Sequence, residues 1–202
     1  MKIALMGASG NVGSRIAAEL SSRGHQITAI ARNAGKIAAL PGVTPTAVDI
    51  ADTGVLVATL KGHAAVISSI HFTASDPDHL ITAVKAAGVP RYLVVGGAGS
   101  LQVAPGKLLV DSPEFPDMYR PEARAGGVFL EKLRAEKQLD WTFLSPSALF
   151  VAGDRTGTFR LGKDDLLVND KGSSISFEDF AIAFVNEIET PKHSRQRFTV
   201  GY

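Results

Sequence analysis

The chain has 202 residues, of which 45% are hydrophobic, and it carries 21 Lys and Arg against 20 Asp and Glu. A chain of this length can bury a sizeable core, and we expect residues 1–202 to form a single α/β domain. The balanced charge argues against a nucleic-acid partner, and the absence of cysteine excludes disulfides, thiolate metal sites and thiol catalysis.

No targeting or membrane signal is apparent. An apolar run follows Met1 almost directly, without the basic and cleavage regions of a secretory leader. No apolar run approaches the roughly 20 residues that a membrane helix needs. The five histidines lack metal-ligand spacing, so no metal is expected. These features predict a cytoplasmic monomer or homodimer with a small-molecule partner and no membrane association.

The most informative stretch lies at the start of the chain. The apolar run at residues 3–6 leads into glycines spaced G-x-x-G-x-x-G, after which apolar residues recur at helical spacing. Gly7 permits the tight exit from a strand, Gly10 lets the backbone approach a pyrophosphate, and Gly13 lets the helix lie close to the sheet. Ordinary turns also contain glycines, but strand, turn and helix in this order favour a dinucleotide site. The expected cofactor residues of this turn are Gly7, Ser9, Gly10, Asn11 and Val12.

Strands and helices alternate in the first half of the chain. Strands are predicted at 26–31 and in the apolar runs that end at Asp49, Ser69 and Gly96, and helices at 53–60 and 78–87. Gly24 is a plausible C-terminal cap of the first helix. This alternation predicts an α/β fold: a single doubly wound Rossmann-type parallel sheet with helices on both faces.

Cofactor preference is decided near the end of the second strand. An NAD site tends to place a carboxylate there, whereas this chain has Arg32, whose guanidinium suits a 2′-phosphate. NADP(H) is therefore preferred and NAD(H) remains possible; a solvated loop arginine is the alternative. Asp49 either accepts a hydrogen bond from the adenine amine or belongs to a helix entry that Asp52 caps. The remaining expected cofactor contacts, all near strand ends, are Ile50, Ser68, Ser69 and Gly97.

The segment of about 99–121 is the expected substrate side. It is rich in proline and lacks sustained periodicity, as binding loops often do. Phe115, Met118 and Tyr119 offer an apolar wall for a flat ring and one hydroxyl, or they attach the loop to the core. His71 follows the fourth strand and either contacts the substrate or is a surface histidine.

Several motifs carry a family resemblance, and they extend from the first strand to the last residue. They are residues 7–13, 31–33, 94–100, 139–146, 155–157, 175–181 and 197–202. The chain resembles the atypical short-chain dehydrogenase/reductase group, and within it the NAD(P)H-flavin reductase branch that is similar to biliverdin-IXβ reductase. The resemblance implies a Rossmann fold, a nicotinamide cofactor, and FMN, FAD or riboflavin as the acceptor substrate.

Departures from the family pattern concern the catalytic residues. Tyr119 is followed four positions later by Ala123, where short-chain dehydrogenases have the lysine that lowers the tyrosine pKa. The serine that the family places after the fifth strand is displaced to Ser100. Ser100 and Tyr119 are therefore the catalytic candidates, while classical alcohol and ketone chemistry is disfavoured.

The last quarter of the chain is expected to support the domain and to form a wall of the pocket. Ser176 and Asp179 resemble a capping box. Phe180, Phe184 and Ile188 mark the buried stripe of the following helix. A closing strand is predicted at 195–200, with its two arginines in solvent.

Three functions are compatible with these observations. The first is an NAD(P)H-dependent reductase that transfers hydride to a flavin or a related flat acceptor such as a quinone. The second is a non-catalytic NADP(H)-binding regulator that senses redox state, and the third is a sugar-nucleotide epimerase or dehydratase. The reductase is favoured, because hydride transfer to a flat acceptor relies mainly on proximity and orientation.

Overall fold

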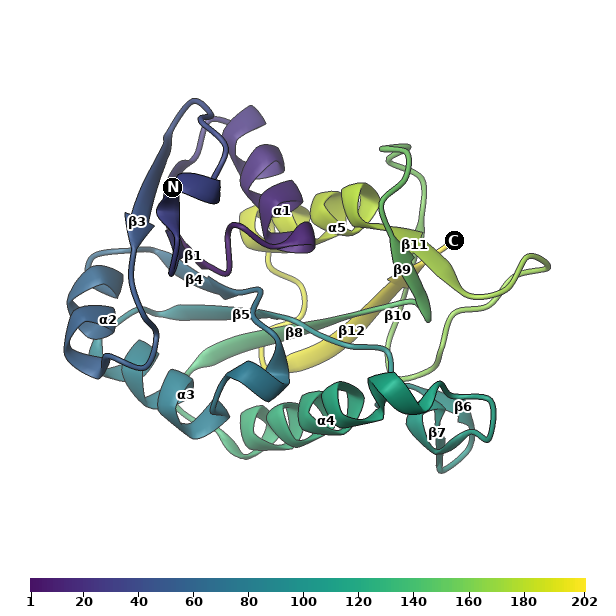
Figure 1. Cartoon of the computed structure of the whole chain (residues 1–202). Coiled ribbons are helices and arrows are strands. Elements are labelled where there is room, and N and C mark those ends of the chain that lie inside the picture. Colours follow the sequence, from purple (N-terminus) through teal and green to yellow (C-terminus); the bar gives the residue numbers. More distant parts are fainter.

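A twisted eight-stranded sheet crosses the molecule, and helices cover both of its faces (Figure 1). The computed structural model describes all 202 residues. The strand order is β10-β12-β8-β5-β4-β1-β2-β3, and every neighbouring pair is parallel except β10 with β12. The predicted α/β fold class is thereby confirmed. None of the helices is both long and apolar enough to cross a bilayer.

The elements of the main sheet follow the predicted alternation. Its strands are β1 (Lys2–Met6), β2 (Gln26–Ala31), β3 (Val43–Ala47), β4 (Ala65–Ser68), β5 (Arg91–Val95), β8 (Asp140–Pro146), β10 (Arg160–Gly162) and β12 (Gln196–Gly201). The helices are α1 (Asn11–Ser22), α2 (Thr53–Leu60), α3 (Pro77–Ala86), α4 (Arg120–Ala135) and α5 (Phe177–Glu189). Short 3-10 turns are η1 (Ala34–Lys36), η2 (Phe72–Ala74), η3 (Leu109–Asp111) and η4 (Asp117–Tyr119).

Two apolar layers hold these elements together. Helices α1 and α5 pack against one face of the sheet, and α2, α3 and α4 cover the other (Figure 1). Phe180, Phe184 and Ile188 are buried beneath α5, as the helical spacing predicts. The predicted Asp52 cap is also present, because its carboxylate accepts the Val55 N–H at 3.0 Å.

The second half of the chain contains short strands that were not predicted. The 99–121 segment contains regular structure, because β6 (Gln102–Ala104) and β7 (Lys107–Leu108) form a small antiparallel hairpin. A second small sheet joins β9 (Leu149–Val151) to β11 (Ser174–Ser176). Strands of two or three residues are too short for their alternation to stand out in a sequence.

The prediction for the two arginines of the closing strand is wrong for Arg197. Arg195 is exposed, but Arg197 is only 7% exposed. Strand β12 lies between β8 and β10 rather than at the edge of the sheet, so Arg197 is covered by its neighbours.

The C-terminal segment is fixed by one buried carboxylate, Asp179 in the first turn of α5. It accepts hydrogen bonds from the Thr156 hydroxyl at 2.6 Å, the Gly157 N–H at 2.8 Å and the Tyr202 hydroxyl at 2.9 Å. Ser176 caps the helix by accepting the Asp179 N–H at 3.0 Å. Burial alone would raise the pKa of Asp179, but the three donors outweigh it and hold the pKa below its ordinary value.

This depressed pKa predicts a pH dependence of stability. Ionised Asp179 stabilises the fold above its unfolded pKa of about 3.9, and the contribution is lost as the pH falls through the lower folded value. We expect Asp179→Asn to lower the free energy of unfolding at neutral pH by about 1–3 kcal/mol. Urea unfolding of the wild type and of this variant should show a difference in the free energy of unfolding, a gap that narrows as the pH falls. The exposed Asp154→Asn change is the control, and a gap that does not vary with pH would contradict the assignment.

Candidate cofactor-binding site

A crevice lies at the carboxyl ends of the first four strands of the sheet. The strand order reverses between β1 and β4, which is where doubly wound sheets bind ligands. The crevice has a volume of about 280 Å³. Its lining residues are Gly7, Ser9, Gly10, Ile30, Ala31, Arg32, Val48, Asp49, Ile50, Ser69, Ile70, His71 and Ala74. The structure thus brings together most of the residues that the sequence assigns to a cofactor.

Close backbone packing explains the three glycines of the first turn. Gly7 has a φ of +80°, and a Cβ there would lie 2.1 Å from the Ser69 carbonyl oxygen. A Cβ on Gly13 would lie 2.2 Å from the Gly7 carbonyl oxygen. Gly10 is different, because its Cβ would meet only the Gly7 oxygen, at 3.3 Å. Gly7 and Gly13 are therefore required by the protein itself, whereas Gly10 leaves space beside the crevice.

The start of α1 presents its backbone donors without a cap from the chain. Gly10 is the N-cap residue and has no side chain to accept the free N–H groups, and no acidic residue lies in the first turn. Asn11 and Val12 are the first two residues of this helix, so their N–H groups lack intrahelical partners. Such a terminus attracts an anion through its donors and its dipole.

One free cation stands at the end of β2. Arg32 is exposed, lines the crevice and forms no hydrogen bond or ion pair with the rest of the chain. The neighbouring Asn33 side chain accepts the Gly35 N–H at 3.1 Å, which fixes the turn after Arg32. At the end of β3, Asp49 is exposed and accepts the Ala51 N–H at 3.0 Å.

The far wall of the crevice is the η2 turn, and Glu122 of α4 holds it in place. The Glu122 carboxylate accepts the Phe72 N–H at 2.7 Å, and the Thr73 N–H and hydroxyl at 3.0 and 2.7 Å. Burial acts to raise the pKa of Glu122, but these hydrogen bonds lower it below its ordinary value. His71, whose side chain is 85% exposed, lies 3.3 Å from the same carboxylate through Nδ1.

Close packing after β5 leaves no room for a side chain at two glycines. A Cβ on Gly96 would lie 2.4 Å from the Phe143 ring, so no side chain fits directly after β5. Gly99 approaches α4 so closely that its Cβ would be 2.6 Å from that of Ala123. Ala123, four positions after Tyr119, therefore packs directly against the backbone of Gly99.

The remaining predicted cofactor residues lie beside the crevice rather than in its lining. Ser68 is 2% exposed within β4. Gly97 is half-buried just after β5 and faces the Phe72 ring, which a Cβ would meet at 3.8 Å. Val12 packs into the apolar layer beneath α1 and α5. These residues support the crevice or border it. Asn11 and Val12, at the start of α1, present their backbone N–H groups there.

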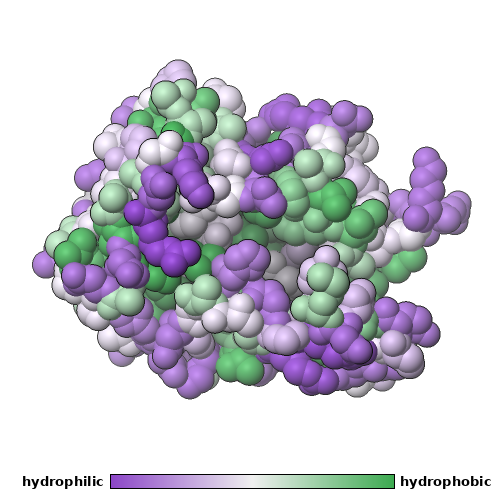
Figure 2. Space-filling view, in the orientation of Figure 1, coloured by the Kyte–Doolittle hydropathy of each residue, from purple (hydrophilic) through white to green (hydrophobic).

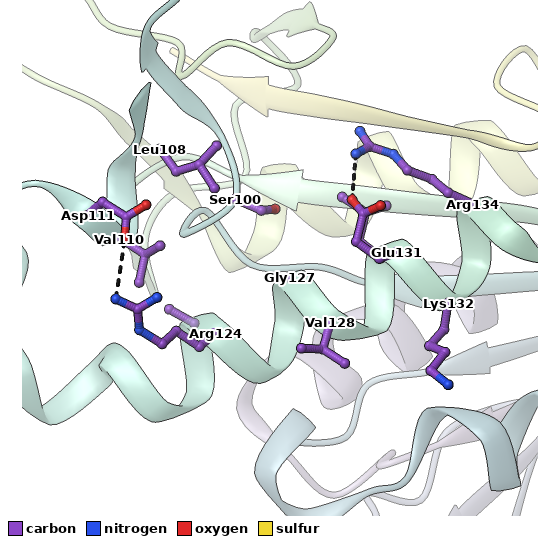
Figure 3. A pocket seen from close by; sticks show the side chains of 12 residues that line it. Ser100, Leu108, Val110, Asp111, Arg124, Gly127, Val128, Glu131, Lys132 and Arg134 are labelled. Carbon is purple, nitrogen blue, oxygen red and sulfur yellow. Dashed lines mark hydrogen bonds and ion pairs between the residues drawn. The ribbon is translucent and has the colours of Figure 1, made fainter. Parts of the chain in front are cut away.

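Of the catalytic and substrate candidates, His71 lines the crevice, whereas the other four do not. Ser100 lines a separate groove along α4 (Figure 3). Its hydroxyl accepts a hydrogen bond from Arg197 Nη1 at 3.3 Å. Tyr119 and Met118 are 57% and 77% exposed before α4. Phe115 lies under the Arg120 guanidinium, 5.6 Å from its ring centre. The geometry gives no contact between this group and the glycine turn.

Sequence reasoning missed two kinds of site residue. The first kind is apolar residues that line the crevice because they are at or just beyond strand ends, and the predicted strand ends were the signal that could have found them. They are Ile30, Ala31, Val48, Ile70 and Ala74. Glu122 reaches the η2 turn from about 50 residues away in the chain. No local pattern indicates that contact.

The second and third glycines of the turn, Gly10 and Gly13, provide a matched test of the site. Gly10→Ala should change the free energy of unfolding by less than about 1 kcal/mol. Its methyl group would occupy the approach to the phosphates, so we expect dinucleotide binding to weaken at least tenfold. Gly13→Ala should instead lower the free energy of unfolding by about 1–3 kcal/mol through overpacking.

Fluorescence titration with NADPH and urea unfolding measure the two effects. A Gly10→Ala variant that binds NADPH like the wild type would contradict the placement of the phosphates at this turn.

The whole chain has relatives of known structure. A family model described as NAD(P)H-binding matches residues 7–191. A "Putative exported protein" from Burkholderia pseudomallei is 45% identical with a TM-score of 0.91, and the match covers 100% of both chains. A "putative epimerase" from Bacteroides thetaiotaomicron is 43% identical with a TM-score of 0.94, covering 100% of this chain and 96% of that one.

A third structure, a "putative NADH-flavin reductase" from Streptococcus pneumoniae TIGR4, is 36% identical with a TM-score of 0.83 and covers 100% of this chain and 99% of its own. The matched region includes the glycine turn and the crevice described above. The chain therefore belongs to the NAD(P)H-binding family of Rossmann-fold proteins, and the resemblance seen in its sequence is confirmed at that level.

Proposed function

We propose that the protein is an NADPH-dependent reductase that transfers hydride to a flavin or a related flat conjugated acceptor such as a quinone. Membership of an NAD(P)H-binding family supports an oxidoreductase. The observation that carries the preference for NADPH is the unpaired Arg32 at the end of β2. A guanidinium there binds a 2′-phosphate, which the usual carboxylate of an NAD site would repel.

The crevice residues fit the adenosine and pyrophosphate half of such a cofactor. The glycine turn and the uncapped start of α1 would hold the pyrophosphate, and Arg32 would bind the 2′-phosphate. Asp49 and Ile50 would hold the adenine, with the Asp49 carboxylate accepting from the exocyclic amine. When bound, the cofactor supplies the hydride. The protein supplies position and orientation, which are large contributions to such a reaction.

The acceptor side favours a flat, apolar molecule. Figure 2 shows a hollow near the centre of this face, with apolar surface beside it over β9 and β11. Leu149 and Val151 of β9 are 57% and 45% exposed, and Met118 and Tyr119 are exposed before α4. An acceptor that takes the hydride from the cofactor and its one proton from solvent needs no tyrosine–lysine pair, and this chain has none.

The names of two relatives bear on the choice of reaction. The Streptococcus pneumoniae protein named as a flavin reductase supports the proposed acceptor. The Bacteroides thetaiotaomicron protein is named as an epimerase, which keeps that activity as the second candidate. Against an epimerase stands Ala123, which replaces the lysine that would activate Tyr119. A regulator that binds NADP(H) without turnover is the third candidate.

The first test is the oxidation of reduced cofactor. We expect absorbance at the reduced-nicotinamide band to fall in a saturable way when purified protein is mixed with NADPH and FMN, riboflavin or a simple quinone. The rate with NADPH should exceed that with NADH. If NADPH binds by fluorescence but no acceptor speeds its oxidation, the reductase proposal fails and the regulator takes its place.

The second test addresses Arg32. We expect Arg32→Glu to weaken NADPH binding about 10- to 100-fold, because a charged hydrogen bond contributes about 1.5–3 kcal/mol. NADH binding should change little. Lys171→Glu makes the same charge change at an exposed site outside the crevice and should leave both affinities as they are. Unchanged NADPH affinity in the Arg32 variant would refute the cofactor assignment.

A further inference from the structure

A small basic pocket lies near the amino ends of β8 and β12, on the face of the sheet that α4 covers. Its volume is about 210 Å³. The lining residues are Arg134, Trp141, Lys163, Asp164, Arg195, Gln196 and Arg197. Four cations therefore surround one carboxylate, in a chain whose formal net charge is only +1. This concentration of positive charge is local.

The carboxylates within reach do not neutralise the pocket. Asp164 is shared, because its Oδ1 lies 2.5 Å from Arg197 Nη2 and 3.2 Å from Arg134 Nη2. Arg134 also pairs with Glu131 at 2.7 Å (Figure 3). Asp165 attracts Arg197 but does not line the pocket.

Two of the cations have no acidic partner at all. Lys163 and Arg195 are exposed and form no ion pair within the chain. The only side-chain hydrogen bond of Arg195 is a long one, 3.3 Å from Nε to the Leu139 carbonyl oxygen. Both side chains are therefore free to turn toward a ligand in the pocket.

The buried side of the pocket also holds donors with weak or missing acceptors. Arg197 is buried, and Nη1 reaches only the hydroxyls of Ser100 and Ser145, at 3.3 and 3.4 Å. The Trp141 ring N–H is buried and has no hydrogen-bond partner. Burial lowers the pKa of Arg197, and repulsion from Arg134 adds to this against the attraction of Asp164. Arg197 has Asp164 as its acceptor, so the donor that is costly to leave buried and unpaired is the Trp141 ring N–H.

We propose that this pocket binds a phosphate-like oxyanion, either inorganic phosphate or the phosphate group of a small phosphomonoester. Guanidinium groups bind phosphate oxygens through paired N–H donors, and the excess charge attracts a dianion. The pocket lies near the amino ends of β8 and β12, whereas the cofactor crevice lies at the carboxyl ends of β1 to β4. The proposal is thus independent of the reductase activity.

The test uses the whole chain saturated with NADP⁺, so that the crevice is filled and cannot bind the added anion. Phosphate is titrated while the indole N–H resonance of Trp141, the single tryptophan, is followed by NMR. We expect a saturable shift with inorganic phosphate or with a small sugar phosphate, and the tighter of the two identifies the natural source. Chloride at equal ionic strength should give no saturable shift.

The Lys163→Ala/Arg195→Ala double variant removes the two unpaired cations without breaking an ion pair. We expect its phosphate affinity to fall at least tenfold, with unchanged melting temperature and NADP⁺ affinity. Lys137→Ala/Lys171→Ala removes the same charge at exposed positions outside the pocket and is the control. Equal phosphate affinity in the two double variants, or an equal shift with chloride, would overturn the proposal.

Discussion

The contact on which the rest of the structure depends is the approach of backbone to backbone at the first turn. Gly7 lies against the Ser69 carbonyl at the end of β4, and Gly13 of α1 lies against Gly7. These contacts fix the distance between β1, β4 and α1 at the point where the strand order reverses. The crevice exists because three elements meet there with no side chain between them.

Local signals were sufficient for the first half of the fold. Long apolar runs and helical spacing gave the β-α alternation to Val95 within one or two residues, and Asp52 marked its helix start. The second half contains strands of two or three residues, such as β7, whose existence depends on the partner strand rather than on their own sequence. Arg197 was misplaced for a related reason: its burial follows from β10 pairing beyond β12.

The candidate site likewise contains residues that could be predicted from the sequence and residues that could not. The glycine turn, Arg32 and Asp49 were predictable because the order of strand, turn and helix places each of them at one edge of the sheet. Ser100 follows β5 but lines the groove at α4, where its hydroxyl meets Arg197 from almost 100 residues away. Contacts between distant segments leave no pattern in a single sequence, and Glu122 is the clearest example.

The Glu122 hydrogen bonds have a consequence for the cost of ligand binding. The turn that walls the crevice is already held at Phe72 and Thr73 by a carboxylate on α4, so its backbone has lost its freedom before any ligand arrives. A ligand that enters such a rigid site pays little additional conformational entropy. The same rigidity connects the crevice to α4, since the turn and the helix can move only together or by breaking these bonds. One side chain of α4 thus makes this wall of the crevice rigid.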